Sequence, residues 1–342
     1  MTISRGNLQR TGVYETRALS KLTGVAWTFE AGDAIRGEPV IEGNTIYFGS
    51  DDHNFYAVYL DSGQLKWKFK TRGRIVSSCA YWEGKVLFGC DDSRVYCLNA
   101  ETGEQIWAYS TGNWIDDAPL VYDNIAFIAS SDRNGYALSM DDGRVLWKFN
   151  SQSKWVNPPA LYNGVLYVTS GTNLFARNLY DGSPVWKDKI EGISRISTCA
   201  AIDGGMMYFG GLDGKMRAYD LRKQKVRWEF ETQGFILSSP AVCNGIVYFG
   251  SRDFHFYAID SHSGELVWKV ETDDKVECSP VIAGNCVYFD TGGFSDPLMN
   301  ALELSTGKPL WTHPDEGDIY TFTVHQGRVY YGTEMGDLVA LC

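Results

Sequence analysis

The chain has 342 residues, of which 44% are hydrophobic and 14% aromatic, and its formal net charge at pH 7 is −11. This acidic balance argues against nucleic acid or an anionic membrane surface as a partner, because both require a basic footprint. No apolar run reaches the length of a membrane span. The eight cysteines form no Cys-x-x-Cys motif, which favours free thiols in a reducing compartment over disulfides or a metal site.

Residues 1–20 are polar, and we expect them to form a strap that lies over the body of the protein. They lack the pattern of a signal peptide. Together with the scattered cysteines, this predicts a cytoplasmic location, or a periplasmic one if a leader has been removed from the natural protein.

From residue 21 onward, one pattern recurs with a period of about 40 residues, as repeat architectures do. Each copy ends in a tryptophan, and these closing residues are Trp27, Trp67, Trp107, Trp147, Trp186, Trp228, Trp268 and Trp311. Because they recur in every copy, we expect them to pack between repeats. The turn residues Asp52, Asp92, Asp132, Asp213 and Asp253 recur as well, which indicates turn capping.

Each repeat contains four short runs that are typical of β-strands, rich in β-branched and aromatic residues and bounded by turn residues. In the sixth copy they are SSPAV (238–242), IVYFGS (246–251), FYAID (256–260) and ELVWKV (265–270). Asn244-Gly245 between the first two runs is a strong hairpin signal. One such sheet cannot bury both of its faces alone, whereas a ring of sheets can, so the repeat predicts a β-propeller.

The first run can be counted eight times, which predicts eight blades in one domain over residues 21–342. The chain ends directly after the third run of the last copy. In contrast, VAWTFE (25–30), around Trp27, reads as a fourth run with no copy before it. We therefore expect residues 25–30 to complete the eighth blade and close the ring, which pairs two edges that would otherwise be open.

Gly-x-x-x-Trp before the blade boundaries, Ser-Pro-Ala/Val in the first run, Val-Tyr-Phe-Gly-Ser and the leader RGNLQRTG (5–12) together carry a family resemblance. The chain resembles the pyrroloquinoline-quinone-dehydrogenase-like eight-bladed propellers with tryptophan-docking repeats. The resemblance implies an all-β fold of four-stranded antiparallel blades. It does not define a function, because similar propellers include quinoprotein dehydrogenases, an outer-membrane assembly lipoprotein and small propellers that bind no quinone.

A functional site should interrupt the repeat, and the residues before each first run show where this happens. One column is apolar with Arg195 as its exception: Ile35, Ile75, Ile115, Trp155, Arg195, Ile236, Val276 and Ile319. Side chains alternate along a strand, so the residues on either side of this column should share one face at the mouth of the central channel.

On that face, the candidate catalytic residues are Arg36, Asp116, Glu277 and Tyr320. The candidate ligand-binding residues are Arg74, Trp114, Asp117, Lys154, Trp155, Asn157, Arg195, Phe235, Lys275 and Asp318. Blades one, seven and eight are neighbours in a closed ring, so Arg36, Glu277 and Tyr320 are expected to converge. A carboxylate, a guanidinium and a phenol at the mouth of an apolar funnel are typical of a small-molecule site and can support acid–base catalysis. The alternative interpretation is a solvated mouth with scattered charges.

Three functional hypotheses follow. The favoured one is a soluble, monomeric propeller that binds a small ligand or a protein partner at the funnel mouth, without a cofactor. The second is a cofactor-independent cyclase, isomerase or lyase that uses the same rim residues. The third is a quinone-dependent dehydrogenase. The dehydrogenases of the family have longer chains, a calcium site and an adjacent Cys-Cys pair, and this sequence has no adjacent cysteines.

Overall fold

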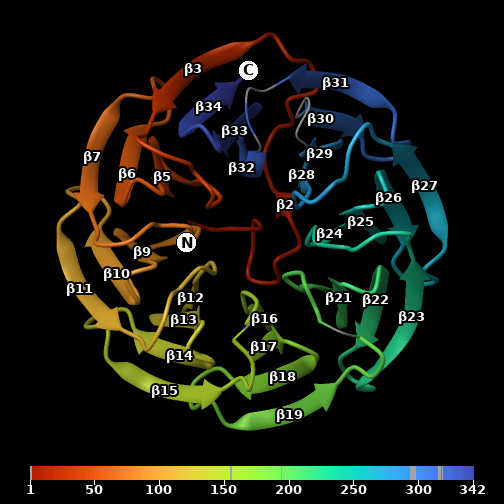
Figure 1. Cartoon of the computed structure of the whole chain (residues 1–342), viewed down its shortest axis with the longest axis horizontal. Helices are drawn as coiled ribbons and strands as arrows, with labels where there is room; N and C mark the ends of the chain where they lie inside the picture. The colour runs from red at the N-terminus through yellow and green to blue at the C-terminus, as the bar shows by residue number, and fades with distance from the viewer. Residues whose placement is uncertain (1, 155, 194, 293–297, 315–316, 318) are drawn as a thin grey trace.

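The computed structural model describes residues 2–154, 156–193, 195–292, 298–314, 317 and 319–342. These residues form eight β-sheets arranged as blades around a central channel (Figure 1). Within these ranges, no helix is long and apolar enough to cross a membrane. The predicted all-β propeller with eight four-stranded antiparallel blades is confirmed.

The first four blades each consist of four consecutive antiparallel strands, which run from the channel outward. Blade one contains β4 (Val40–Glu42), β5 (Thr45–Gly49), β6 (Asn54–Tyr59) and β7 (Leu65–Lys70). Blade two contains β8 (Cys79–Trp82), β9 (Lys85–Gly89), β10 (Arg94–Asn99) and β11 (Gln105–Ser110). Blade three contains β12 (Leu120–Tyr122), β13 (Ile125–Ser130), β14 (Asn134–Ser139) and β15 (Val145–Asn150). Blade four contains β16 (Ala160–Tyr162), β17 (Val165–Ser170), β18 (Asn173–Asn178) and β19 (Pro184–Lys189).

The next three blades have the same order. Blade five contains β20 (Ala201–Asp203), β21 (Met206–Gly210), β22 (Lys215–Asp220) and β23 (Lys225–Glu231). Blade six contains β24 (Ala241–Cys243), β25 (Ile246–Ser251), β26 (His255–Asp260) and β27 (Leu266–Glu271). Blade seven contains β28 (Val281–Ala283), β29 (Cys286–Thr291), β30 (Leu298–Glu303) and β31 (Pro309–Pro314). Second strands such as β5 are buried along their whole length because neighbouring blades cover both of their faces.

Blade eight joins the two ends of the chain. It contains β32 (Ile319–His325), β33 (Arg328–Thr333) and β34 (Asp337–Leu341) from the C-terminus, and β3 (Val25–Glu30) supplies its fourth strand. β3 pairs antiparallel with β34, and Trp27 lies opposite Ala340. The predicted closure of the ring by the strand around Trp27 is confirmed.

The segment before β3 crosses the channel and binds the innermost strands of several blades (Figure 1). β1 (Thr2–Ile3) pairs antiparallel with β8 of blade two, and β2 (Val13–Tyr14) pairs parallel with β28 of blade seven. Between them, the carbonyl groups of Leu8, Gln9 and Thr11 accept hydrogen bonds from the first strands of blades four, five and six. The segment is thus bonded to blades on several sides of the ring.

Tryptophans at the ends of the blades dock against the next blade along the ring. The indole N–H of Trp107 in β11 donates to the carbonyl oxygen of Met140 in blade three, at 3.0 Å. Its ring lies against Gly143, whose φ of +72° suits glycine and whose missing Cβ leaves room for the indole. The same hydrogen bond links Trp27 with Leu60, Trp67 with Ala100, Trp147 with Leu179 and Trp228 with Ser261. For these tryptophans, the predicted packing between blades is confirmed.

The repeated aspartates hold the loops between second and third strands. Asp92 accepts the N–H of Arg94 within its own turn, so the predicted turn-capping role is confirmed there. It also accepts the hydroxyl of Tyr96 at 2.6 Å and the N–H of Arg72 from the loop that follows blade one. One carboxylate therefore caps a turn and links two blades.

We expect Trp107→Ala to lower the free energy of unfolding by about 3–5 kcal/mol, because it removes a large side chain that is only 7% exposed and leaves a cavity between two blades. Urea denaturation followed by circular dichroism measures this loss. Trp114→Ala is the matched control, because Trp114 is 53% exposed, and its effect should stay within about 0.5 kcal/mol. Equal losses in the two variants would contradict the docking role.

Candidate functional site

The central channel is closed at one end by the N-terminal segment. The buried Arg5 side chain donates hydrogen bonds to the carbonyl oxygens of Ser239, Pro240 and Pro280, in blades six and seven. The Arg10 side chain, 1% exposed, donates in the same way to three carbonyl groups of blades three and four. Because backbone carbonyls are fixed in position, these charge-assisted bonds hold the segment firmly across the channel.

The carboxylate of Glu38 completes this floor. It accepts the backbone N–H of Arg5 and the hydroxyl of Tyr14, and only 5% of the residue is exposed. Burial raises the pKa of Glu38, which the hydrogen bond from Tyr14 and the charge of Arg5 oppose. Glu38 therefore links both ends of the segment to the wall of blade one.

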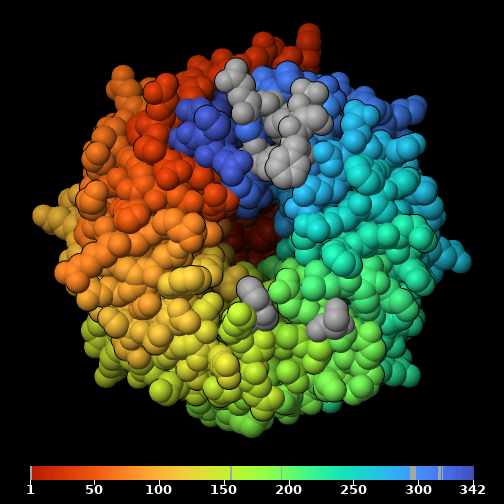
Figure 2. All heavy atoms as spheres, in the orientation of Figure 1, coloured from red at the N-terminus to blue at the C-terminus, as the bar shows by residue number. Residues whose placement is uncertain are grey.

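The closed channel forms a cavity of about 370 Å³ that opens at the opposite face of the ring. Figure 2 shows this mouth, with atoms of the N-terminal segment visible deep in the central hollow. Pockets that bind small ligands have volumes of roughly 300–1,000 Å³. The charged and polar residues that line the cavity include Arg5, Arg10, Arg36, Glu38, Asp116, Asp117, Cys199 and Tyr320.

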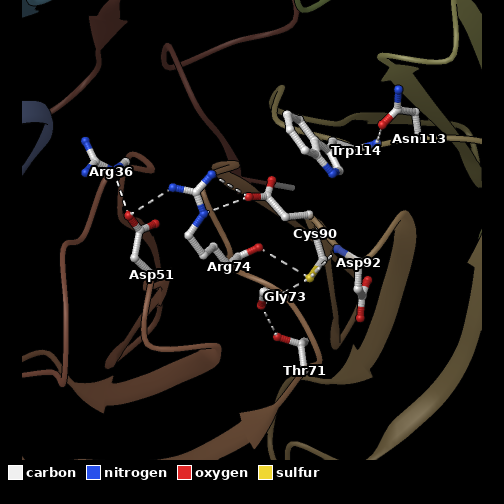
Figure 3. A network of polar contacts seen from close by, with 10 residues as sticks. Arg36, Asp51, Thr71, Gly73, Arg74, Cys90, Asp92, Asn113 and Trp114 are labelled. Carbon is white, nitrogen blue, oxygen red and sulfur yellow. Dashed lines mark hydrogen bonds and ion pairs between the residues drawn. The ribbon is translucent and has the colours of Figure 1, made fainter.

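At the mouth, charges of alternating sign run from blade eight to blade two. The guanidinium of Arg36 lies 4.5 Å from the centre of the Tyr320 ring, and its Nε donates to Asp51 at 2.8 Å. Arg74 reaches Asp51 at 3.9 Å, and its Nε donates to Oδ2 of Asp91 at 2.9 Å, with Nη2 at the same distance from that oxygen (Figure 3). The row therefore places each guanidinium between a carboxylate and a second anionic or aromatic group.

Two carboxyl groups continue this row into blade three. Partial desolvation at the channel mouth, together with a hydrogen bond to Asp91 and its negative charge, raises the pKa of Asp116 to about 6, against the charge of Arg74. Burial and the charge of Asp116 raise the pKa of Asp117 to about 8, against the charge of Arg10. At neutral pH, Asp116 is mainly ionised and Asp117 keeps its proton. Such a separation of two neighbouring carboxyl groups is typical of acid–base pairs.

The structure brings only some of the predicted catalytic residues together. Arg36, Asp116 and Tyr320 line the closed cavity. Glu277 lies in an adjoining cavity of about 270 Å³, which shares Tyr320 with the first. There Glu277 forms ion pairs with Arg252 and, at 3.4 Å, with Lys275. The expected convergence therefore joins Arg36 with Tyr320, while Glu277 belongs to the neighbouring cavity.

The predicted ligand-binding residues are spread around the mouth. Asp117 lines the cavity and Lys275 the adjoining one, whereas Arg74, Trp114, Lys154 and Phe235 are exposed at the rim. The side chain of Asn157 is engaged within the ring, since it donates to Thr169 at 2.7 Å. Trp155 and Asp318 lie outside the described residues.

The assignment of Arg195 to the apolar column is wrong by one residue. The N–H of Ile196 donates to Gly171 of the preceding blade, as Ile236 does to Gly211, and Ile196 is only 1% exposed. Ile196 is therefore the packing residue of blade five. Arg195 shares the rim position of Arg74 and Phe235.

The arginines of the floor and the aspartates Asp51 and Asp91 were not among the predicted site residues. Arg5 and Arg10 belong to the leader RGNLQRTG, but their partners are backbone carbonyls, which leave no mark in a sequence. Asp51 and Asp91, in contrast, could have been found from the sequence. Each is an extra aspartate directly before the repeated turn aspartate, at a position where blade three has Ser131.

We expect Asp117→Asn to change how stability depends on pH. The pKa of Asp117 is about 8 in the folded protein and about 3.9 in an unfolded chain, so the folded state binds more protons in between. This carboxyl group therefore lowers the free energy of unfolding progressively as pH rises from about 4 to 8. The variant should lack this loss and gain stability relative to the natural protein as pH rises, which thermal denaturation over a pH series measures.

Asp142→Asn provides a control of opposite sign. The N–H of Arg144 lowers the pKa of Asp142, so its stabilising contribution is present above the unfolded value of about 4 and lost below it. At neutral pH, this variant should have a lower free energy of unfolding than the natural protein. In acid, the two free energies should become equal. The same trend in both variants would contradict the assignment for Asp117.

A family model and several solved structures both match this chain. A family model described as outer membrane protein assembly factor BamB matches residues 73–202, 181–314 and 212–341. No curated protein sequence matches the chain.

Solved structures with very different descriptions share the fold. BamB from Moraxella catarrhalis superposes with a TM-score of 0.81 at 16% identity, over 94% of this chain and 99% of that one. A europium-containing methanol dehydrogenase gives 0.80 at 15% identity, over 96% and 88%. The computationally designed Ika8 protein gives 0.80 at 16% identity, over 95% and 99%. The family match covers most of the chain, and the chain belongs to the family described as outer membrane protein assembly factor BamB, with the expected eight-bladed fold.

Proposed function

We propose that the protein binds a small polar molecule in the closed central cavity. One observation carries this proposal: the N-terminal segment converts an open channel into a cup of about 370 Å³ with charged groups at its mouth. Closure of the ring explains the floor, but it requires none of the ionisable side chains of Arg36, Asp116 and Asp117 that line the cup.

The lining suits a ligand that carries both acceptor and donor groups. Arg36 offers guanidinium donors, and its position over the Tyr320 ring limits the orientations that its side chain adopts. Asp116 offers a carboxylate, and Asp117 offers a carboxyl proton at neutral pH. A hydroxy acid or an amino acid has this combination of groups.

Proton transfer in the same cup is the second candidate function, and the two carboxyl groups favour it. Asp116, with a pKa of about 6, is suited to accept a proton, and the neighbouring Asp117, with a pKa of about 8, is suited to donate one. An isomerase or a lyase without a cofactor requires this pair of roles.

A protein segment is the alternative occupant of the mouth. Trp114 and Phe235 are 53% and 48% exposed at the rim, and aromatic side chains of this kind are enriched at protein interfaces. The similarity to an assembly factor suggests protein binding as well.

Among the described residues, no group of three or more His, Cys, Asp or Glu side chains has an arrangement that could hold a metal ion. These residues therefore offer no ligand set for the metal named for the europium-containing methanol dehydrogenase.

Native mass spectrometry of the protein purified from its own cells tests the proposal. We expect a retained small molecule, and Arg36→Gln or Asp116→Asn should weaken its binding about tenfold or more, since each removes a charged hydrogen-bonding group. Arg144→Gln is the matched control, because the Arg144 side chain is 73% exposed outside the channel.

The pattern of loss separates the candidates. Graded weakening in both variants supports binding, whereas turnover of the retained molecule that Asp116→Asn abolishes supports proton transfer. Capture of a protein that depends on Trp114 and Phe235, with an empty cup, would overturn the small-molecule proposal.

A further inference from the structure

A groove of about 500 Å³ lies between blades one and two, at the face of the ring opposite the mouth. Its residues belong to the hairpin turns at positions 43–44, 84 and 99–101 and to the strand ends beside them. These turns join first to second and third to fourth strands, whereas the loops of the mouth join second to third strands and one blade to the next. The groove is therefore separate from the cup.

Two tyrosines in this groove break the repeat. Tyr59 ends the third strand of blade one, opposite Thr45 in the ladder. The equivalent positions of blades two to seven hold Asn99, Ser139, Asn178, Asp220, Asp260 and Glu303. Tyr81 lies in the first strand of blade two, opposite Val86. Its equivalents in the other blades are Ile41, Val121, Leu161, Ile202, Val242, Ile282 and Val324.

Tyr59 does not cap the turn that follows it, whereas the equivalent residues of several other blades do. The side chain of Asn99 accepts the backbone N–H groups of Glu101 and Thr102 and so caps the turn that follows it. Asn178 and Asp260 cap the corresponding turns in blades four and six. A phenol ring cannot reach back to its own turn in this way. Tyr59 is also 39% exposed, so burial does not compensate for the lost cap.

Tyr81 is held in position by its contact with a buried tyrosine of blade one. Tyr81 stacks on Tyr47, with ring centres 6.2 Å apart and ring planes at 25°. Tyr47 is 3% exposed, and its hydroxyl donates to the carbonyl oxygen of Ala100 in blade two. Tyr59 comes from the strand β6 of blade one, which faces blade two at this interface. The groove is thus bordered by tyrosines from both blades.

Planar polar groups and one ammonium group surround these rings. Glu42, Asn44, Asn99 and Glu101 line the groove, and the Lys66 ammonium pairs with Glu101 across the two blades. Asn99 already accepts two turn N–H groups through its side-chain oxygen, and Glu42 accepts the hydroxyl of Thr2 through one oxygen. The amide NH2 of Asn99, the amide of Asn44 and the second oxygen of Glu42 can still form hydrogen bonds with a ligand.

We propose that this groove binds a carbohydrate. A sugar ring has an apolar C–H face, which packs on an aromatic ring, and hydroxyl groups at its edge, which pair with amides and carboxylates. The groove has both features side by side, and its volume suits one or two sugar rings. A purely apolar partner would displace water from these polar side chains without replacing its hydrogen bonds, which costs binding energy.

Isothermal titration with neutral oligosaccharides tests this site, with cellotetraose, maltotetraose and chitotetraose as probes. We expect at least one of them to bind. Tyr59→Asn and Tyr81→Val install residues that other blades use at the same positions, so the fold should be retained. Each variant should weaken binding about tenfold or more, through the loss of an aromatic contact.

Stability separates binding from a structural role. Tyr59→Asn restores the turn cap of the other blades, so its unfolding temperature should be equal to or above that of the natural protein. Tyr180→Asn is the matched control: Tyr180 is 59% exposed on the turn after β18 of blade four, and its loss should leave sugar binding unchanged.

Three outcomes would overturn the proposal. The first is the absence of binding to all three oligosaccharides. The second is binding that survives both Tyr59→Asn and Tyr81→Val. The third is binding that only Asp116→Asn removes, which would place the sugar in the central cup.

Discussion

The contact between each closing tryptophan and the next blade is the interaction on which the rest of the structure depends. A four-stranded sheet of this size buries too little surface to be stable alone, so each blade relies on its neighbours. The indole ring of Trp107 fills the space over Gly143, and its N–H binds the carbonyl of Met140. The contact therefore combines apolar burial with a directional hydrogen bond, which fixes the angle between blades as well as their distance.

Closure of the ring imposes a second constraint. In other blades, the tryptophan of the preceding blade docks on the turn between the third and fourth strands, but blade eight lacks this turn because its fourth strand comes from the other end of the chain. Trp311 of blade seven donates instead to the carbonyl oxygen of Leu19, at 2.7 Å. The N-terminal segment thus replaces a missing part of blade eight, while Arg5 and Arg10 anchor its first residues to backbone carbonyls inside the ring. The same segment that completes the packing also closes the channel, so the cup is a consequence of how the ring is closed.

The fold could be predicted from the sequence because its decisive contacts recur. Trp27 without a blade before it, for example, identified the closing strand in advance. The site was predicted less well, and the reasons are physical. Tyr320 and Arg36 were paired correctly because they occupy neighbouring blades at similar positions. Arg195 was misplaced because it is flanked by two buried isoleucines, Ile193 and Ile196, and an apolar pattern cannot choose between them. The hydrogen bond from Ile196 to Gly171 makes that choice.

Departures from a repeat are of two kinds, and the structure distinguishes them by their partners. Arg217 in blade five replaces the tyrosine that binds the turn aspartate elsewhere, but it is 2% exposed and pairs with both Asp213 and Glu229. This change is compensated inside its own blade and needs no ligand to explain it. Asp116 beside Asp91 places two carboxyl groups in contact, and Tyr59 cannot cap its own turn as Asn99 does, although the hydroxyl of Ser62 accepts the N–H of Gln64 there. Arg74 pairs with Asp91, but its charge offsets the raised pKa of Asp116 only in part. Residues that lower stability without a structural return are found mainly at functional sites, so the cup and the groove are the places where selection for a ligand best explains the sequence.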